Sequence, residues 1–377
     1  MRAYVFTDKA LARHAGRFVW LSIDSERPEN AAFLEKYPIS VWPTLLVLDA
    51  REEKAALKWA GGATVPQLEK LFEDGERAVL GSAPGLEGEL ARADNLNAEG
   101  KPGEAVKALE ALIARAPPDW SRRPRAVESL LLALMLDGKA DACTRVALAE
   151  VPKLPRSPSL ANAAGTGLAC ALDAPKDAPG RKEAIAALEG YARAALGPPE
   201  IAMAADDRSG VYEVLVQARQ DAGDTEGKKQ VAREWATYLE GEAARAPNAE
   251  ARAVFDSHRL GAYLALGEPA RALPMLEASE KALPEDYNPP ARLAYVLRQL
   301  GRYDEALAAS DRALVHAYGP RKLNILRERA NIQRARKDGP GTRKALEDAL
   351  AYARSLPPSR GVQRAISVLE KELAEQK

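Results

Sequence analysis

The chain has 377 residues, of which 46% are hydrophobic and 29% are charged, and this is enough material for two or three domains with sizeable cores. Its 54 lysines and arginines balance its 54 aspartates and glutamates, so the net charge gives no general reason to expect a nucleic acid or an anionic membrane as partner. No run of 18 uncharged apolar residues and no signal-peptide core occurs, so the sequence as written predicts a soluble, cytoplasmic protein.

Residues 1–78 alternate strand and helix signals. The stretch "FVWLSID" predicts a strand at residues 18–24, and "PENAAFLEKY" predicts a helix at 28–37 that begins near a proline. The apolar run at 44–49 has the length of a buried strand, and a polar turn separates it from a second strand at 54–61, which predicts a hairpin. A helix at 64–77 opens with a threonine cap. The predicted order is β-α-β-β-α.

From about residue 86 onward, strand signals give way to paired helix patterns separated by short turns. The turns recur every 34 to 44 residues, with one gap of 85 that fits two units and a turn at 173–181. A two-helix unit at this period predicts an all-α helical solenoid. The expected domains are an α/β region at 1–78, a hinge at 79–85 and a repeat domain at 86–377. The turn glycines are Gly100, Gly138, Gly223, Gly267, Gly301 and Gly339.

Two consecutive units resemble tetratricopeptide repeats. In "PARLAYVLRQLGRYDEALAASDRALVHAYGP", Gly301 is the turn glycine, Tyr303 the aromatic that follows it, and Ala306 and Ala313 the small residues of the second helix. Small residues let neighbouring helices approach closely, and glycine permits the tight turn. The resemblance extends more loosely over about residues 86–375, and armadillo-like or simple helical-hairpin stacks are alternatives. It implies that a protein or peptide partner binds on the concave face.

The helix expected at residues 321–339, "RKLNILRERANIQRARKDG", carries the most suggestive surface of the repeat region. Arg327, Asn331 and Arg334 share a face, and basic residues far outnumber acidic ones in this stretch. Such a surface suits a peptide carboxylate or an acidic segment. A solvated basic helix is the simpler alternative. A nucleic-acid partner is disfavoured because no aromatic residues interrupt the basic stretch.

The region 1–78 resembles the thioredoxin fold in its element order and in the motif "VWPTLLVLD". In that family a cis-proline stands at the head of this strand and faces a Cys-x-x-Cys dithiol, so the resemblance implies a substrate groove at Trp42, Pro43 and Thr44. No cysteine occurs within the first 142 residues, so no catalytic residue carries over. The resemblance therefore implies a partial thioredoxin-like domain that lacks its first strand, with a start assigned too late as the simplest explanation and a redox-dead relic as the other. An intact fold is not expected without that strand. The Trp42–Pro43 bond is expected to be cis in a longer form of the chain, and a mixture or a trans bond in the chain as given.

Two functions follow from these resemblances. The first is a thiol-disulfide oxidoreductase in a longer form of the chain, exported if a signal peptide precedes it, with the repeats docking a protein partner. The alternative is a non-enzymatic interaction scaffold in which the α/β region only caps the solenoid. No cofactor or metal is implied, because no phosphate loop, zinc spacing or catalytic-serine motif is found. Cys143 and Cys170 are interpreted as buried small residues in helices in preference to a disulfide.

Overall fold

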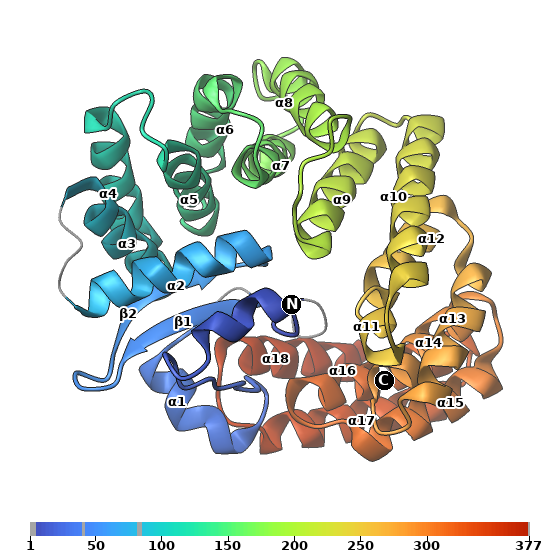
Figure 1. The fold of residues 1–377 in the computed structure, drawn as a ribbon. Coiled ribbons are helices and arrows are strands. Elements are labelled where there is room, and N and C mark those ends of the chain that lie inside the picture. The colour runs from blue at the N-terminus through green and yellow to red at the C-terminus, as the bar shows by residue number, and fades with distance from the viewer. Residues whose placement is uncertain (1–4, 40–41, 81–84, 376–377) are drawn as a thin grey trace. The chain divides into compact units, whose positions relative to one another are not determined.

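The computed structural model describes residues 5–39, 42–80 and 85–375 (Figure 1). The chain divides into two compact units. The first comprises Met1–Val19 and Leu34–Trp235, and the second comprises Trp20–Phe33 and Ala236–Lys377. The division therefore falls inside one long helix, α10 (Thr225–Arg245), and sets a short N-terminal segment apart from its neighbours in sequence. Of the expected hinge at 79–85, residues 81–84 lie outside the described part of the chain.

The N-terminal part of the first unit is a small α/β arrangement. Its strands β1 (Thr44–Asp49) and β2 (Lys54–Ala60) form the predicted antiparallel hairpin, with Thr44 opposite Ala60 and Asp49 opposite Lys54. The predicted helices are confirmed as α1 (Ala31–Lys36), which a short 3-10 turn precedes, and α2 (Val65–Val79). A further 3-10 helix, η1 (Lys9–His14), precedes them.

Helix α2 lies directly against the hairpin, and its sequence explains both its start and its close approach. Thr64 and Gln67 form a reciprocal capping box that satisfies two backbone N–H groups at the helix start. Leu68 and Leu71 then face the core shared with Val47. Gly75 makes the contact possible, because a Cβ added there would lie 2.7 Å from a Val47 methyl carbon.

The strand predicted at residues 18–24 is wrong, because no strand forms there in the described structure. Val19 is 89% exposed and Leu21 is 71% exposed. A strand is held by ladder hydrogen bonds to a neighbour, and in the described sheet β1 and β2 pair only with each other. This stretch has a β-rich composition, but the described sheet offers it no neighbouring strand with which to form hydrogen bonds. Trp20–Phe33 belongs to the second unit instead.

The rest of the chain is built of antiparallel helix pairs, as the solenoid prediction requires (Figure 1). In the first unit each first helix also contacts the first helix of the next pair, as α5 does with α7 and α7 with α9. The helices of this unit are α3 (Gly85–Ala98), α4 (Pro102–Arg115), α5 (Arg123–Leu136), α6 (Ala140–Glu150), α7 (Pro158–Asp173), α8 (Arg181–Leu196) and α9 (Ala205–Asp221), with η3 (Val151–Lys153) between α6 and α7.

The second unit continues the same construction and ends on a single amphipathic helix. Its last helix packs on α17 through the fully buried Leu369. Ala306 and Ala313, predicted at helix contacts, are both fully buried on α15. The elements of this unit are α11 (Ala249–Ala253), α12 (Asp256–Leu266), η4 (Pro269–Arg271), α13 (Ala272–Ala282), α14 (Asn288–Gln299), α15 (Tyr303–His316), α16 (Gly319–Ala335), α17 (Gly339–Ser355) and α18 (Arg360–Glu375).

The turns between paired helices use the left-handed conformation that glycine adopts without strain. Five of the predicted turn glycines, from Gly100 to Gly301, have φ between 69° and 80°. The prediction is wrong at the last turn, where Gly339 is the first residue of α17. There Lys337 takes the left-handed position with φ of 64°.

Cys143 and Cys170 form a disulfide that joins α6 to α7, which corrects the preference for two unbonded residues. Their Cα atoms are 6.0 Å apart and both side chains are buried. The reason lies in the packing of the two helices, which lie directly against each other. Cys143 stands near the start of α6 and Cys170 near the end of α7, and both side chains are turned into this contact.

Candidate partner-binding site on α16

Helix α16 contributes four polar side chains to a small pocket in the second unit. Asn324, Arg327, Glu328 and Asn331 are separated by three, four or seven residues from one another or adjoin, so they lie along one side of the helix. The pocket has a volume of about 240 Å³. It is lined by Asn324, Arg327, Glu328, Asn331, Leu346, Leu369 and Glu372.

A chain of hydrogen bonds fixes one wall of this pocket. Arg334 donates to the Asn331 side-chain oxygen at 2.9 Å and to the Glu372 carboxylate at 2.6 Å. Asn331 in turn donates to Glu328 at 3.2 Å, and Glu328 accepts from Arg298 on α14 at 2.5 Å. Each carboxylate of the pocket is therefore already matched to an arginine, and the side chains are held in place before any ligand arrives.

Arg327 is different from the other charged residues of the pocket. Its side chain is partly buried and has no hydrogen bond or ion pair with any described residue. Of the three residues singled out from sequence, Arg327 and Asn331 line the pocket together, whereas Arg334 is engaged by Glu372 at its edge. A guanidinium with open donors beside two asparagine amides can bind a carboxylate by charge-assisted hydrogen bonds.

At the N-terminal end of the same helix, an acidic segment of the chain itself is bound. The Arg321 guanidinium donates to the Glu26 carboxylate at 2.7 Å, and the Tyr318 hydroxyl donates to Asp24. Arg27 stacks over the Tyr318 ring, with its guanidinium carbon 4.0 Å from the ring centre. Sequence reasoning missed this contact because nearly 300 residues separate its two sides.

The backbone of the acidic segment comes close to that of α16, and two tyrosines beside it have raised pKa values. A Cβ added to Gly319 would lie 2.8 Å from the Glu26 carbonyl oxygen, so the segment approaches α16 where the helix has no side chain. Burial, reinforced by the Glu26 charge, raises the pKa of Tyr287 to about 12. The hydrogen bond to Asp24 raises the pKa of Tyr318 as well.

Trp42, Pro43 and Thr44, the residues expected to form a substrate groove, stand at the head of β1 in the first unit. The Trp42–Pro43 bond is cis, which corrects the prediction of a mixture or a trans bond in the chain as given. The Pro43 carbonyl accepts a hydrogen bond from the Gly61 N–H at 2.9 Å. Trp42 is 66% exposed, and residues 40 and 41 beside it lie outside the described structure. The substrate-groove role of these three residues stays a prediction.

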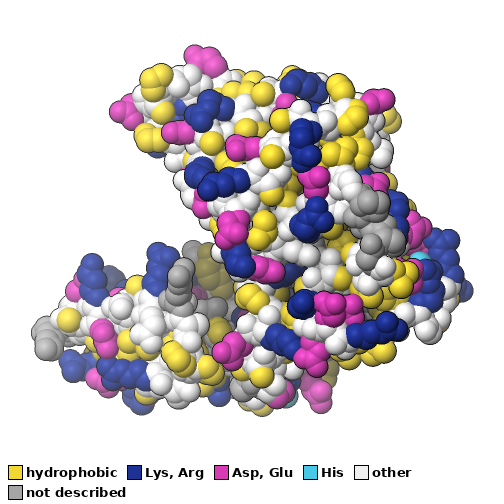
Figure 2. All heavy atoms as spheres, turned by 90° about the vertical axis from the view of Figure 1, so that its left-hand side faces the viewer, with side chains coloured by type: hydrophobic (Ala, Val, Ile, Leu, Met, Phe, Trp, Pro, Cys, Tyr) yellow, Lys and Arg dark blue, Asp and Glu magenta, His cyan; other side chains and the backbone are white. Residues whose placement is uncertain are grey.

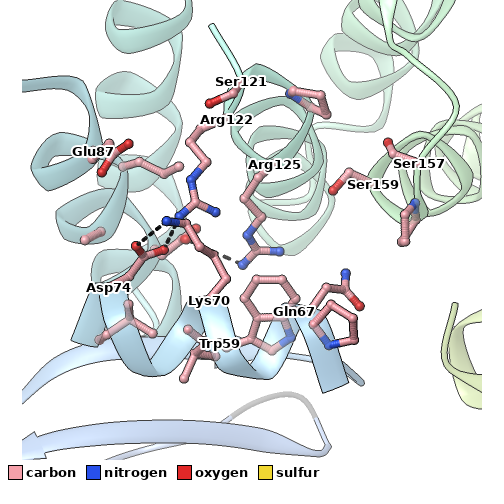
Figure 3. Close-up of a pocket in the computed structure, with 18 of the residues that line it drawn as sticks. Trp59, Gln67, Lys70, Asp74, Glu87, Ser121, Arg122, Arg125, Ser157 and Ser159 are labelled. Atoms are coloured by element: carbon pink, nitrogen blue, oxygen red, sulfur yellow. Dashed lines mark hydrogen bonds and ion pairs between the residues drawn. The ribbon is translucent and has the colours of Figure 1, made fainter. Parts of the chain in front are cut away.

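The first unit has a larger pocket of about 400 Å³, between the α/β part and the helix pairs (Figure 3). Its walls come from β2 and α2 on one side and from α3 and the first turns of α5 and α7 on the other. Leucines and prolines make up much of the lining. The polar residues labelled in Figure 3 are Gln67, Lys70, Asp74, Glu87, Ser121, Arg122, Arg125, Ser157 and Ser159, beside Trp59.

Arg125 and Trp59 form the centre of this pocket. The Arg125 guanidinium carbon lies 3.9 Å from the centre of a Trp59 ring, and the same guanidinium is 3.5 Å from Asp94 and from Glu128. Asp94 accepts a 2.6 Å hydrogen bond from Ser129, and burial raises the pKa of its carboxyl. This stack attaches β2 to α5, so its first role is structural. Nothing in the sequence links a tryptophan and an arginine 66 positions apart.

Charges of both signs are interspersed on the face shown in Figure 2, in keeping with the balanced composition. Among the described residues, no helix is both long enough and apolar enough to cross a membrane. Within the same part of the chain, no group of three or more histidine, cysteine, aspartate or glutamate side chains is arranged to hold a metal ion.

No protein-family model and no curated protein matches this chain. Similar solved structures include a tetratricopeptide repeat protein from Parabacteroides merdae, with 10% identity over 76% of this chain and 98% of that one and a TM-score of 0.46. Another is the APC/C hetero-tetramer Cut9–Hcn1, with 12% identity over 80% of this chain and 54% of that one and a TM-score of 0.43. A third is the TPR2AB-domain:pHSP90 complex of yeast Sti1, with 13% identity over 77% of this chain and 98% of that one and a TM-score of 0.28.

TM-scores under 0.5 do not establish a common arrangement of helices, so the class of this chain rests on its own helix pairs. Those pairs stack through their first helices and turn at left-handed residues, and they define a helical-repeat solenoid joined to a small α/β region.

Proposed function

We propose that the chain is a protein-interaction scaffold whose α16 surface binds an extended acidic segment of a partner protein. The observation that carries this proposal is Arg327, which lines a pocket without a described partner while every other charged group there is paired. The two carboxylates of the pocket are each paired with an arginine, whereas the Arg327 guanidinium has no described partner. Such a pocket favours a ligand that carries a negative charge.

The rigid wall of the pocket supports the same function. Because Arg334, Asn331 and Glu328 already hold one another, little side-chain entropy is lost when a ligand binds beside them. The amides of Asn324 and Asn331 can orient a carboxylate or a peptide group against Arg327. Solenoids present such rows because each repeat contributes a helix to one continuous surface.

The proposal is tested by fluorescence anisotropy with a labelled peptide of about six glutamates and a free C-terminal carboxylate. Arg327→Ala should weaken binding about tenfold or more, since a hydrogen bond to a charged group is worth about 1.5–3 kcal/mol. Arg343→Ala is the matched control, because Arg343 is an exposed arginine of the same unit that only pairs with Glu347. Equal affinities of the Arg327→Ala variant and the unmodified chain would remove the basis of the proposal.

Oxidoreductase activity is the second function considered from sequence, and it remains tied to the thioredoxin resemblance of residues 1–78. The order of α1, β1, β2 and α2 agrees with that resemblance, whereas the strand predicted at 18–24 does not form. The two cysteines of the chain are bonded to each other and buried, so neither is a free thiol. The structural observations therefore favour the scaffold.

A further inference from the structure

The acidic segment bound at the N-terminal end of α16 lies on the same helix as the pocket around Arg327. Arg321, which holds Glu26, is two turns before Glu328 and precedes Asn324 by three residues. The contact belongs to one compact unit, because Trp20–Phe33 and the helices from Ala236 onward are grouped together. We infer that the chain's own segment Asp24–Arg27 occupies one end of the partner surface, and that an acidic partner must displace it to bind fully.

The geometry of the helix makes the competition direct. Arg321 and Arg327 are six residues apart, which is about 9 Å along the helix axis and about 120° around it, at 1.5 Å and about 100° per residue. An extended peptide covers the axial distance in about three residues and needs about two more to pass around the helix. A partner that places one carboxylate in the pocket therefore brings another, about five residues along its chain, to Arg321, where Glu26 already lies.

The segment is bound in a way that permits displacement. Its ion pair is surface-exposed, with the Arg321 side chain 56% and the Glu26 side chain 22% exposed, and such pairs contribute little to stability. Leu21, just before it, is 71% exposed, so the docked segment buries little apolar area there. The contacts are nevertheless specific, because they combine an ion pair, a tyrosine hydrogen bond and an arginine stacked on a ring.

The inference rests on the proposed function, and it adds both the chemistry of the partner and a form of regulation. A ligand that can bind only when an internal segment has left shows an apparent affinity reduced by the fraction of molecules in the open state. A partner with several acidic residues in sequence would reach both Arg327 and Arg321, whereas a single carboxylate would bind in the pocket alone and leave Glu26 in place.

Two variants open the site by different means, and each has a matched control. Glu26→Gln removes the ion pair with Arg321. Gly319→Ala leaves every charge in place but puts a methyl group 2.8 Å from the Glu26 carbonyl oxygen. Glu29→Gln removes an exposed charge in the 3-10 turn Pro28–Asn30, which directly follows the segment. Gly301→Ala controls for backbone strain, because Gly301 also has a positive φ but has no neighbour within 4 Å of an added Cβ.

The labelled glutamate peptide is titrated into the full chain and each variant. We expect Glu26→Gln and Gly319→Ala to tighten binding about three- to tenfold, with the two controls unchanged. Hydrogen exchange of residues 20–27 should also speed up when the peptide is added to the unmodified chain. Equal affinities in all these variants, with binding still lost in Arg327→Ala, would overturn the displacement and leave the scaffold function standing. No peptide binding in any variant would overturn both.

Discussion

Asp207 shows how one partly buried carboxyl can make the stability of the first unit depend on pH. It stands in the first turn of α9 and accepts hydrogen bonds from the Gly62 backbone and from Asn162. Burial raises its pKa to about 6, and the nearby charges of Glu128 and Asp206 act in the same direction. The carboxyl links the loop after β2 to α9, so its protonation state affects the attachment of the α/β part.

Asp207→Asn should stabilise the first unit at neutral and alkaline pH. A folded-state pKa raised above the unfolded value means that the protonated carboxyl contributes stability below about pH 4, and that this contribution is lost as the pH rises through about 6. Asparagine stays neutral, so its advantage over aspartate should grow to at most about 3 kcal/mol near pH 8. Urea unfolding at several pH values measures this difference.

The control for this measurement is Glu213→Gln, which changes an exposed carboxylate on the same helix. Its effect on the free energy of unfolding should be small at every pH. A constant difference between Asp207→Asn and the unmodified chain across the range would show that Asp207 ionises as freely in the folded chain as in the unfolded one.

At the scale of the element, the helix pair α6–α7 is joined by the disulfide between Cys143 and Cys170. A bridge over a sequence separation of 27 residues restricts the unfolded chain and contributes about 3.5 kcal/mol in the loop-entropy description. Both side chains are buried, so a reductant reaches them mainly when the pair opens. Disulfides of this kind persist in oxidising surroundings, and the bond therefore bears on the compartment in which the chain is stable.

Unfolding in the presence of a reductant should lower the midpoint of the first unit, because the reduced chain gains conformational freedom when it unfolds. The double variant Cys143→Ala with Cys170→Ala should start from a lower midpoint and show no response to the reductant. Calorimetry with and without reductant measures both effects. A midpoint of the unmodified chain that does not move after full reduction would contradict a stabilising role for the bond.

Residues 18–24 show, at the scale of the element, that a β-rich composition is not sufficient to form a strand. Its composition satisfies every local requirement of a strand, but strand formation depends on a neighbour to which hydrogen bonds can be made. In the described structure the stretch has no such neighbour, and the residues that follow it bind α16 through charged and aromatic side chains. The β-propensity of residues 18–24 therefore did not decide their conformation, and the segment that follows them is positioned by its contacts with α16.

At the scale of the whole molecule, two compact units with separate cores predict unfolding in two steps. Ala306 is fully buried at a helix contact in the second unit, and Ala306→Leu should overpack this contact and cost about 1–3 kcal/mol. Differential scanning calorimetry should then show one transition shifted downward and the other unchanged. Two-state behaviour is not expected of a chain with two such units.

Ala308→Leu is the matched control, because Ala308 is an exposed alanine on the same helix α15. It should leave both transitions near their original midpoints. A single transition that shifts as a whole in Ala306→Leu would show that the helix stack transmits stability across the division, as strongly coupled repeats do.

The sequence by itself determined most elements of this protein, with the strand predicted at residues 18–24 as the exception. Hydrophobic period and turn glycines were sufficient to predict the β1–β2 hairpin, the capped helix α2 and the helix pairs, because these structures depend on residues close together along the chain. The face shared by Arg327 and Asn331 was also predictable, since it follows from helical spacing alone.

Only the tertiary structure decided which of these surfaces are occupied. Glu26 on Arg321 and Arg125 on Trp59 are contacts between residues far apart in sequence, and no periodicity or motif encodes them. Arg334 pairs with Glu372, and Arg327 then has no partner within the described part of the chain; this pairing depends on how α18 packs against α16 and α17. Local rules assign a side chain to a face, whereas its partner is fixed by packing between elements, and the packing decides whether that face can bind anything else.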